Sequence, residues 1–248
     1  MQIGLIGAGA MATALARGWQ RPVLVSDPMK DRAEALVAEV GGEVADSNLD
    51  VAARSDVVVL CHKPAQLVEV ATEVDGTAQS VVSILGSVDL QSIRGAYSSS
   101  AAYRVLPNLP VELRKGVLCW PIENGPEGNE VRDLFGEVGE LVELPESDIE
   151  VAMTMSSNAP GWIAFVVEAF VAAGVSNGLS HELATKLVVE TLSGTAALLE
   201  ARSGDAERLR MEVCSPGGST ERGVAAMTQA GLPEAVMAAV DAVLRPAQ

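Results

Sequence analysis

The chain of 248 residues is poor in aromatic residues, which make up 3% of it, and it has only two histidines and three cysteines. With so few rings, alanine, valine and leucine must fill most of the core, as they do in close-packed helices and buried parallel strands. The cysteines are odd in number and show no C-x-x-C spacing, which argues against a disulfide framework. We therefore expect free thiols in a reducing compartment, the cytoplasm.

Positive charge is scarce as well, because 17 basic residues face 33 acidic ones and leave a net charge of −16. Such a surface repels phosphate backbones and anionic lipid headgroups. The chain has no run of 18 uninterrupted apolar residues, and its start, MQIGLIGAGAMA, lacks the basic region and cleavage site of a signal peptide. We expect neither nucleic acid nor a membrane as a partner.

Short apolar runs alternate with helical patterns over residues 1–147. The expected strands are 2–6, 23–26, 57–60, 80–85, 102–106, 117–120 and 140–144. The expected helices are 10–19, 30–40 and 125–139. This alternation predicts βαβ units and therefore an α/β domain with a parallel sheet.

Residues 148–248 have a helical pattern with no convincing strand. The expected helices are 148–173, 180–202, 205–213 and 217–245, the last interrupted near Gly231-Leu232-Pro233. These helices are rich in alanine, valine and leucine, and so few residues cannot hide every apolar face by themselves. The segment is either a compact cap on the first domain or a dimerisation domain, and its apolarity favours dimerisation.

The first glycine-rich turn lies between a predicted strand and a predicted helix. Gly7-Ala8-Gly9-Ala10-Met11-Ala12 forms a G-x-G-x-x-A fingerprint. The first glycine permits a tight turn, the second lets the backbone approach a pyrophosphate, and the small third residue lets helix and strand pack closely. The start of the helix then offers N–H groups to the phosphates. Together these features predict a Rossmann-type doubly wound sheet that binds a dinucleotide.

Asp27 ends the second predicted strand, 20 residues after Gly7. In Rossmann domains a carboxylate at this place accepts the adenosine ribose hydroxyls, and it would repel a 2′-phosphate, so Asp27 favours NADH over NADPH. Lys30 and Arg32 lie close enough in sequence to offset part of this charge. Alternatively, Asp27 only forms a turn before Pro28.

Cys61-His62-Lys63-Pro64 follows the third predicted strand, at the sheet edge where ligands of doubly wound folds bind. Lys63 can contact phosphate or ribose. His62 could donate a proton, but no carboxylate motif accompanies it, and we do not assign it that role. We expect no metal site, since no His/Cys ligand spacing is present, and we expect Cys61 to be a buried apolar residue.

Two later loops each have two interpretations. Leu106-Pro107-Asn108-Leu109-Pro110 could line a nicotinamide pocket or could simply connect two elements. Ser215-Pro216-Gly217-Gly218-Ser219-Thr220 places a turn before a helix that Ser219 and Thr220 could cap. Its backbone N–H groups suit a carboxylate, although an ordinary connection between helices would look the same.

Taken in order and spacing, these motifs resemble those of the Δ1-pyrroline-5-carboxylate reductases, the last enzymes of proline biosynthesis. The matching segments are GLIGAGAMATAL, HKP, RVLPNLP, the AP of SSNAPGW, and VCSPGGST. The resemblance covers essentially the whole chain. It implies a Rossmann domain followed by an all-helical domain that interlocks two subunits into a dimer, with further assembly, often into decamers.

The resemblance also implies the site residues. The family's cofactor contacts correspond to Gly7, Ala8, Gly9, Ala10, Met11, Ala12, Asp27, Asn48, His62, Lys63 and Leu85. Its substrate contacts correspond to Gly217, Gly218, Ser219 and Thr220, in the loop that holds the substrate carboxylate. Thr220 matches the threonine whose hydroxyl reaches the ring nitrogen, and it is our candidate catalytic residue.

Three departures from the family pattern bear on substrate and cofactor. Leu109 replaces a threonine near the nicotinamide, and Trp162 replaces a tyrosine at the end of the run 156–162. Asp27 stands where many members have a small polar residue facing a 2′-phosphate. Whereas the family resemblance favours NADPH, Asp27 favours NADH.

The implied reaction is hydride transfer from C4 of NAD(P)H to the C=N carbon of pyrroline-5-carboxylate, which gives L-proline. No side-chain acid suggests itself, so the imine arrives protonated or water supplies the proton. The alternatives are a reductase of another cyclic imine or keto acid and a non-catalytic dinucleotide-binding protein. The intact glycine turn and the intact SPGGST loop argue against the non-catalytic one.

Overall fold

The computed structural model describes residues 1–125 and 128–245, and the chain divides into two compact units, Met1–Pro160 and Gly161–Gln248. Residues 148–160 thus belong to the first unit, although the predicted domains are 1–147 and 148–248. The two domain ranges stay a prediction.

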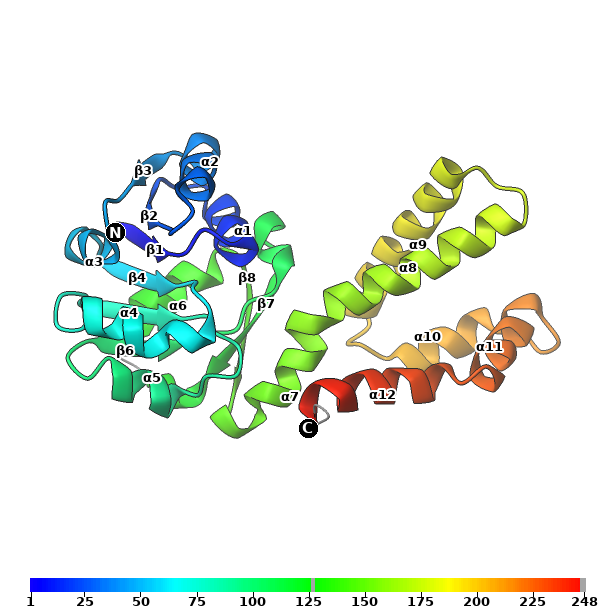
Figure 1. Ribbon diagram of the computed structural model, residues 1–248. Coiled ribbons are helices and arrows are strands. Elements are labelled where there is room, and N and C mark those ends of the chain that lie inside the picture. The colour runs from blue at the N-terminus through cyan, green and yellow to red at the C-terminus, as the bar shows by residue number, and fades with distance from the viewer. Residues whose placement is uncertain (126–127, 246–248) are drawn as a thin grey trace. The chain divides into compact units, whose positions relative to one another are not determined.

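A six-stranded parallel sheet forms the centre of the first unit (Figure 1). Its strands are β1 (Ile3–Ile6), β2 (Val23–Ser26), β3 (Gly42–Val44), β4 (Val57–Leu60), β5 (Ser80–Ser83) and β6 (Ala101–Arg104). They lie in the order β3-β2-β1-β4-β5-β6, so β2 and β3 are added on one side of β1, and β4, β5 and β6 on the other. The predicted Rossmann-type doubly wound sheet is confirmed. The central strands β1 and β4 are fully buried and apolar, as expected for parallel strands with helices on both faces.

The helices of this unit are α1 (Ala10–Trp19), α2 (Lys30–Val40), α3 (Asn48–Arg54), α4 (Leu67–Val74), α5 (Leu90–Ala96) and α6 (Asn129–Gly136). Buried side chains of α1, α2 and α6 share one core cluster with one face of the sheet, and those of α3, α4 and α5 share a second with the other face. Of the helix predicted over 125–139, residues 126 and 127 lie outside the described residues, and α6 ends at Gly136.

Two further strands, β7 (Gly116–Pro121) and β8 (Gly139–Leu144), form a separate parallel pair. The 3-10 turns are η1 (Pro64–Gln66), η2 (Leu109–Leu113), η3 (Ile122–Asn124) and η5 (Glu146–Asp148). The unit closes with α7 (Ile149–Met153), a π-helical turn η6 (Thr154–Asn158) and the first residues of α8 (Ala159–Ser176).

A buried arginine ties the end of this unit to its sheet. Arg104, the last residue of β6, is 1% exposed. Its guanidinium donates to Glu146 at 2.6 Å and to Glu150 at 2.9 Å. Because one side chain holds both η5 and α7, residues beyond 147 pack with the first unit.

The second unit is built from helices, as predicted (Figure 1). After the main part of α8 come α9 (His181–Ala201), α10 (Ala206–Val213), α11 (Ser219–Gln229) and α12 (Leu232–Leu244). The predicted interruption of the last stretch is confirmed, since Gly231 separates α11 from α12. Residues 246–248 of the predicted domain lie outside the described residues.

Much of the second unit's apolar surface is exposed. Phe165 is 71% exposed, Phe170 49% and Leu187 51%. Side chains of α8 and α9 line an apolar hollow of about 460 Å³. The helical run 146–176 is also long and apolar enough to cross a membrane by length and composition. One such helix is a weak sign of a membrane span, because helices of soluble proteins can meet the same requirement.

Candidate active site

The turn between β1 and α1 lies directly against the end of β4. Gly7 has a φ of +108°, and a Cβ atom on it would lie 2.8 Å from the Cys61 carbonyl oxygen. Side chains rarely adopt this φ, so the tight turn requires glycine. At Gly9, the N-cap of α1, a Cβ atom would meet no atom of the described residues within 4 Å. The turn therefore leaves open space beside the free N–H groups that begin α1, which fits a pyrophosphate.

The other residues of the fingerprint divide between surface and core. Ala10 is exposed and Met11 is half-buried at the start of α1. Ala8 and Ala12 are buried, with 6% and 1% of their surfaces exposed. The small side chain of Ala12 lets α1 pack closely on the sheet, which is the role predicted for it.

Asp27 connects the two loops that would hold the adenosine end of a dinucleotide. Its Oδ2 accepts the Ala8 N–H at 2.7 Å, and its Oδ1 accepts the Met29 N–H at 2.8 Å. The residue thus forms the turn after β2 and also contacts the glycine turn, so the two interpretations of Asp27 do not exclude each other. Each carboxylate oxygen keeps a second lone pair that can accept a ribose hydroxyl.

Asn48 lies beside the end of β2, where the sequence alone could not place it. Its Oδ1 accepts the Ser26 hydroxyl at 2.6 Å, and its Nδ2 donates to Glu73 Oε2 at 2.6 Å. Sequence reasoning missed Ser26 and Glu73, which orient this amide. They are 22 and 25 residues from Asn48, and no spacing pattern signals such contacts.

The loop after β4 places His62 next to Gly7, since a Cβ atom on Gly7 would lie 3.1 Å from the His62 nitrogen. Burial lowers the pKa of His62, and the Lys63 carbonyl, 2.9 Å from Nδ1, and the Glu69 carboxylate oppose this effect. Lys63 is exposed, and its contact with a phosphate stays a prediction. Cys61 is half-buried and packs against the core, so the expectation of a buried apolar residue holds only in part. Burial raises the pKa of its thiol, which disfavours the nucleophilic thiolate.

Leu85 follows β5 at the same edge of the sheet. Its side chain is 3% exposed and packs in the core, and its N–H donates to the Ser83 hydroxyl at 3.2 Å. A cofactor contact at this position would therefore use the main chain of Leu85 and not its side chain.

The proline-rich loop 106–110 is held from two sides by one buried amide. Asn108 accepts the Val117 N–H at 2.8 Å and donates to the Ser156 carbonyl at 3.1 Å. Leu109 next to it is 51% exposed and free to line a pocket. The loop is thus fixed by hydrogen bonds to β7 and to the π-helical turn. Its contact with a nicotinamide stays a prediction.

The SPGGST segment forms a tight turn in the second unit. The Gly218 N–H donates to the Ser215 carbonyl at 2.8 Å, which closes a four-residue turn. Gly217, its third residue, has a φ of +73°, the positive value that a type II turn requires there. Both backbone groups of Gly217 are bound by side chains of α11. Its N–H donates to Glu221 at 2.7 Å, and its carbonyl accepts from Arg222 at 2.7 Å.

The expectation that Ser219 and Thr220 cap the helix is wrong. Gly218 is the N-cap and makes no side-chain cap bond, so Ser219 and Thr220 are the first two helical residues. Capping requires the non-helical backbone of the N-cap position. Both hydroxyls are exposed and therefore available to a ligand, and the adjacent N–H groups have no acceptor within the helix.

The structure thus brings the eleven predicted cofactor residues to one region of the first unit and the four predicted substrate residues to one turn of the second. Their roles stay predictions. Among the described residues, no group of three or more His, Cys, Asp or Glu side chains could hold a metal ion.

Two family models match the chain. Residues 2–87 match the model described as "NADP oxidoreductase coenzyme F420-dependent", and residues 146–248 match "Pyrroline-5-carboxylate reductase dimerisation". The first range contains the glycine turn, Asp27, Asn48 and the loop after β4. The second contains the SPGGST turn.

Known proteins resemble the chain over its full length. Pyrroline-5-carboxylate reductase from Synechocystis is 31% identical and covers 100% of this chain and 97% of its own. The crystal structure of the Streptococcus pyogenes enzyme matches with a TM-score of 0.89 at 25% identity, over 98% of this chain and 96% of its own. That of Plasmodium falciparum pyrroline carboxylate reductase with NADP bound matches the fold, with a TM-score of 0.87 at 24% identity over 98% and 95%. The chain therefore belongs to the pyrroline-5-carboxylate reductase family.

Proposed function

We propose that this protein reduces the C=N bond of pyrroline-5-carboxylate to give L-proline, with NAD(P)H as the reductant. The observation that carries the proposal is the 31% identity to a pyrroline-5-carboxylate reductase along the whole of both chains. The geometry supports it, because the glycine turn has the open space that a pyrophosphate needs. In the SPGGST turn, the N–H groups of Ser219 and Thr220 begin α11 and have no acceptor within the helix.

The residues of the chain have simple tasks in this reaction. When bound, the reduced nicotinamide supplies the hydride that the imine carbon accepts. The N–H groups of Ser219 and Thr220 hold the substrate carboxylate, and the Thr220 hydroxyl orients the ring nitrogen. The nitrogen gains one proton overall, from water or by entering as the protonated imine.

For the cofactor, we propose a preference for NADH. The Asp27 carboxylate is held by the Ala8 and Met29 N–H groups, so it cannot easily turn away from a 2′-phosphate. Lys30 and Arg32 are exposed, and among the described residues their side chains make no ion pair. Lys30 and Arg32 could offset part of the charge of Asp27. The ratio of kcat/KM for NADH to that for NADPH measures the net effect.

The exposed apolar face of the second unit supports self-association. Its residues fall within the range that matches a dimerisation model. We propose a homodimer through α8 and α9, and assembly of dimers, up to a decamer, in the cytoplasm. The apolar run 146–176 then serves the subunit interface rather than a membrane, and the protein should elute as a multimer without detergent.

Steady-state kinetics with purified protein test the proposal. Rapid oxidation of NADH or NADPH with pyrroline-5-carboxylate is the expected result. Turnover only with another cyclic imine or a keto acid would point to the departures at Leu109 and Trp162. Tight dinucleotide binding without turnover of any of these substrates would show a non-catalytic protein.

A further inference from the structure

A carboxylate of the chain itself occupies part of the SPGGST turn. Glu221 Oε2 lies 2.7 Å from the Gly217 nitrogen and accepts its N–H. Arg222 Nη1 donates to the Gly217 carbonyl at 2.7 Å, so the two side chains bind the same residue through its two peptide groups. Glu221 and Arg222 are exposed residues in the first turns of α11.

The Gly217 N–H is one of the donors that follow Pro216 and face the start of α11. A carboxylate is the acceptor that such N–H groups and the positive end of a helix favour. Glu221 already supplies one. A ligand carboxylate at this turn therefore finds one donor taken and a like charge beside it, and it is left with the N–H groups of Ser219 and Thr220.

We propose that Glu221 is a specificity-determining residue, which weakens the binding of five-membered rings that carry a carboxylate relative to rings that lack one. The inference rests on the proposed function, because it takes the SPGGST turn as the place of the substrate carboxylate. It makes the preference of this enzyme among cyclic imines depend on one residue outside the predicted site.

A purely structural role for Glu221 predicts a different result. An acidic residue in the first turn stabilises a helix through its dipole, so its loss would lower the melting temperature. The loss of Glu221 would then change the binding of rings with a carboxylate and of rings without one to the same extent. If Glu221 instead competes for the Gly217 N–H, its loss should change the affinity only for ligands that carry a carboxylate.

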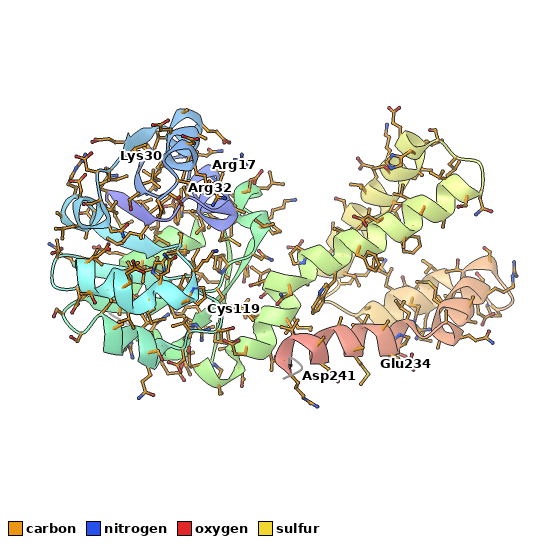
Figure 2. All side chains as sticks on the ribbon, in the orientation of Figure 1. Arg17, Lys30, Arg32, Cys119, Glu234 and Asp241 are labelled. Atoms are coloured by element: carbon orange, nitrogen blue, oxygen red, sulfur yellow. The ribbon has the colours of Figure 1, made fainter. Side chains whose placement is uncertain are left out.

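The experiment compares wild type with Glu221→Ala and Glu221→Gln. Kinetics give KM for pyrroline-5-carboxylate and for unsubstituted pyrroline, the same cyclic imine without the carboxylate. Calorimetry on the NAD(P)⁺-saturated protein gives the Kd of tetrahydrofuran-2-carboxylate, which carries the carboxylate without a titratable nitrogen. Glu234→Ala is the matched control, because Glu234 also lies in the first turn of a helix, α12, and makes no hydrogen bond among the described residues (Figure 2).

For Glu221→Ala we expect KM for pyrroline-5-carboxylate and Kd for tetrahydrofuran-2-carboxylate to fall about tenfold, the effect of one hydrogen bond to a charged group. KM for unsubstituted pyrroline should not change. Glu221→Gln keeps an acceptor without the charge, so both values should fall by less. Glu234→Ala should match wild type.

Unchanged or weaker binding of the carboxylates in Glu221→Ala would overturn the inference, as would an equal change for unsubstituted pyrroline. If wild type turned over neither imine, the proposed reaction would fail while the calorimetric comparison still tested Glu221. No gain of tetrahydrofuran-2-carboxylate binding in that comparison would count against Glu221 alone.

Discussion

Asp27 accepts the Ala8 N–H at 2.7 Å, so the carboxylate that follows β2 contacts the glycine-rich turn directly. One residue thereby fixes the turn, and its negative charge lies at the position that we predict to contact the adenosine ribose of a dinucleotide. The contact supports the proposed preference for NADH, because the charge is held in place by two backbone donors.

Replacing Asp27 with serine should shift the preference towards NADPH. The variant loses a charge that repels the 2′-phosphate, so the ratio of kcat/KM for NADPH to that for NADH should rise about tenfold, which corresponds to roughly 1.4 kcal/mol. Asp31→Ser is the control, since Asp31 is exposed in the first turn of α2 and should leave the ratio unchanged. An unchanged ratio in Asp27→Ser would mean that Asp27 does not face the ribose.

Replacing Thr220 with alanine should lower kcat/KM for the imine about tenfold, as expected for loss of one hydrogen bond to the reacting molecule. The KM for the cofactor should stay nearly the same, because Thr220 belongs to the second unit's turn and not to the predicted cofactor residues. Thr228→Ala, on the same helix, removes a hydroxyl that bonds the Val224 carbonyl and should have no kinetic effect. Full turnover in Thr220→Ala would remove Thr220 from the mechanism.

Arg104 should matter for stability far more than a surface arginine. Arg104→Met removes the guanidinium that binds both Glu146 and Glu150, and we expect a loss of about 3 kcal/mol in the free energy of unfolding. Arg132→Met breaks an exposed pair with Glu143 and should cost less than about 1 kcal/mol. Urea titration of both variants measures the difference. Equal losses of unfolding free energy in the two variants would show that the buried ion pairs of Arg104 stabilise the fold no more than an exposed pair does.

Acid should destabilise the first unit through His62. Burial lowers the pKa of His62 in the folded state below the ordinary 6.5. Between these two pKa values, the unfolded chain binds a proton more readily than the folded one. Stability linked to this residue is present above the unfolded value and is lost as the pH falls below it. His62→Gln should therefore lose less melting temperature than wild type between about pH 7.5 and 5.5, and His181→Gln, on the exposed start of α9, should behave like wild type. An identical pH dependence in wild type and His62→Gln would contradict the assignment.

The parts of the fold that the sequence predicts are those with strong local patterns. The strand 57–60 is a run of apolar residues between turns, and it coincides with β4. The short strand β3 escapes prediction because Gly41-Gly42 has the pattern of a break, whereas Gly42 begins the strand and lies against the Val23 backbone. The helices α3, α4 and α5 have eight residues or fewer, too few to show a clear helical period.

The contacts within the candidate site are less predictable than its members. The glycine fingerprint can be located from its spacing between a strand and a helix. Gly7 forms the expected tight turn and Gly9 lies beside open space, while their contact with a pyrophosphate stays a prediction. The partners of Asn48 come from β2 and α4, and only the folded sheet brings them together. Glu221 does have a sequence signal, a glutamate three residues after the N-cap, which is the spacing of a capping box. The signal is hidden as long as Ser219 is expected to be the cap.

Two glycine substitutions separate folding from cofactor binding. Gly7→Ala forces a side chain into a φ of +108° with a Cβ 2.8 Å from the Cys61 carbonyl oxygen, so it should cost about 2 kcal/mol or more in the free energy of unfolding. Gly9→Ala has an ordinary φ of −77° and no clash among the described residues, so its melting temperature should match wild type. Its added methyl group would nevertheless stand where a pyrophosphate approaches the backbone, and the Kd of NADH should rise at least about tenfold. Calorimetric titration with NADH measures this, and normal affinity in a stable Gly9→Ala variant would show that the dinucleotide does not use this turn.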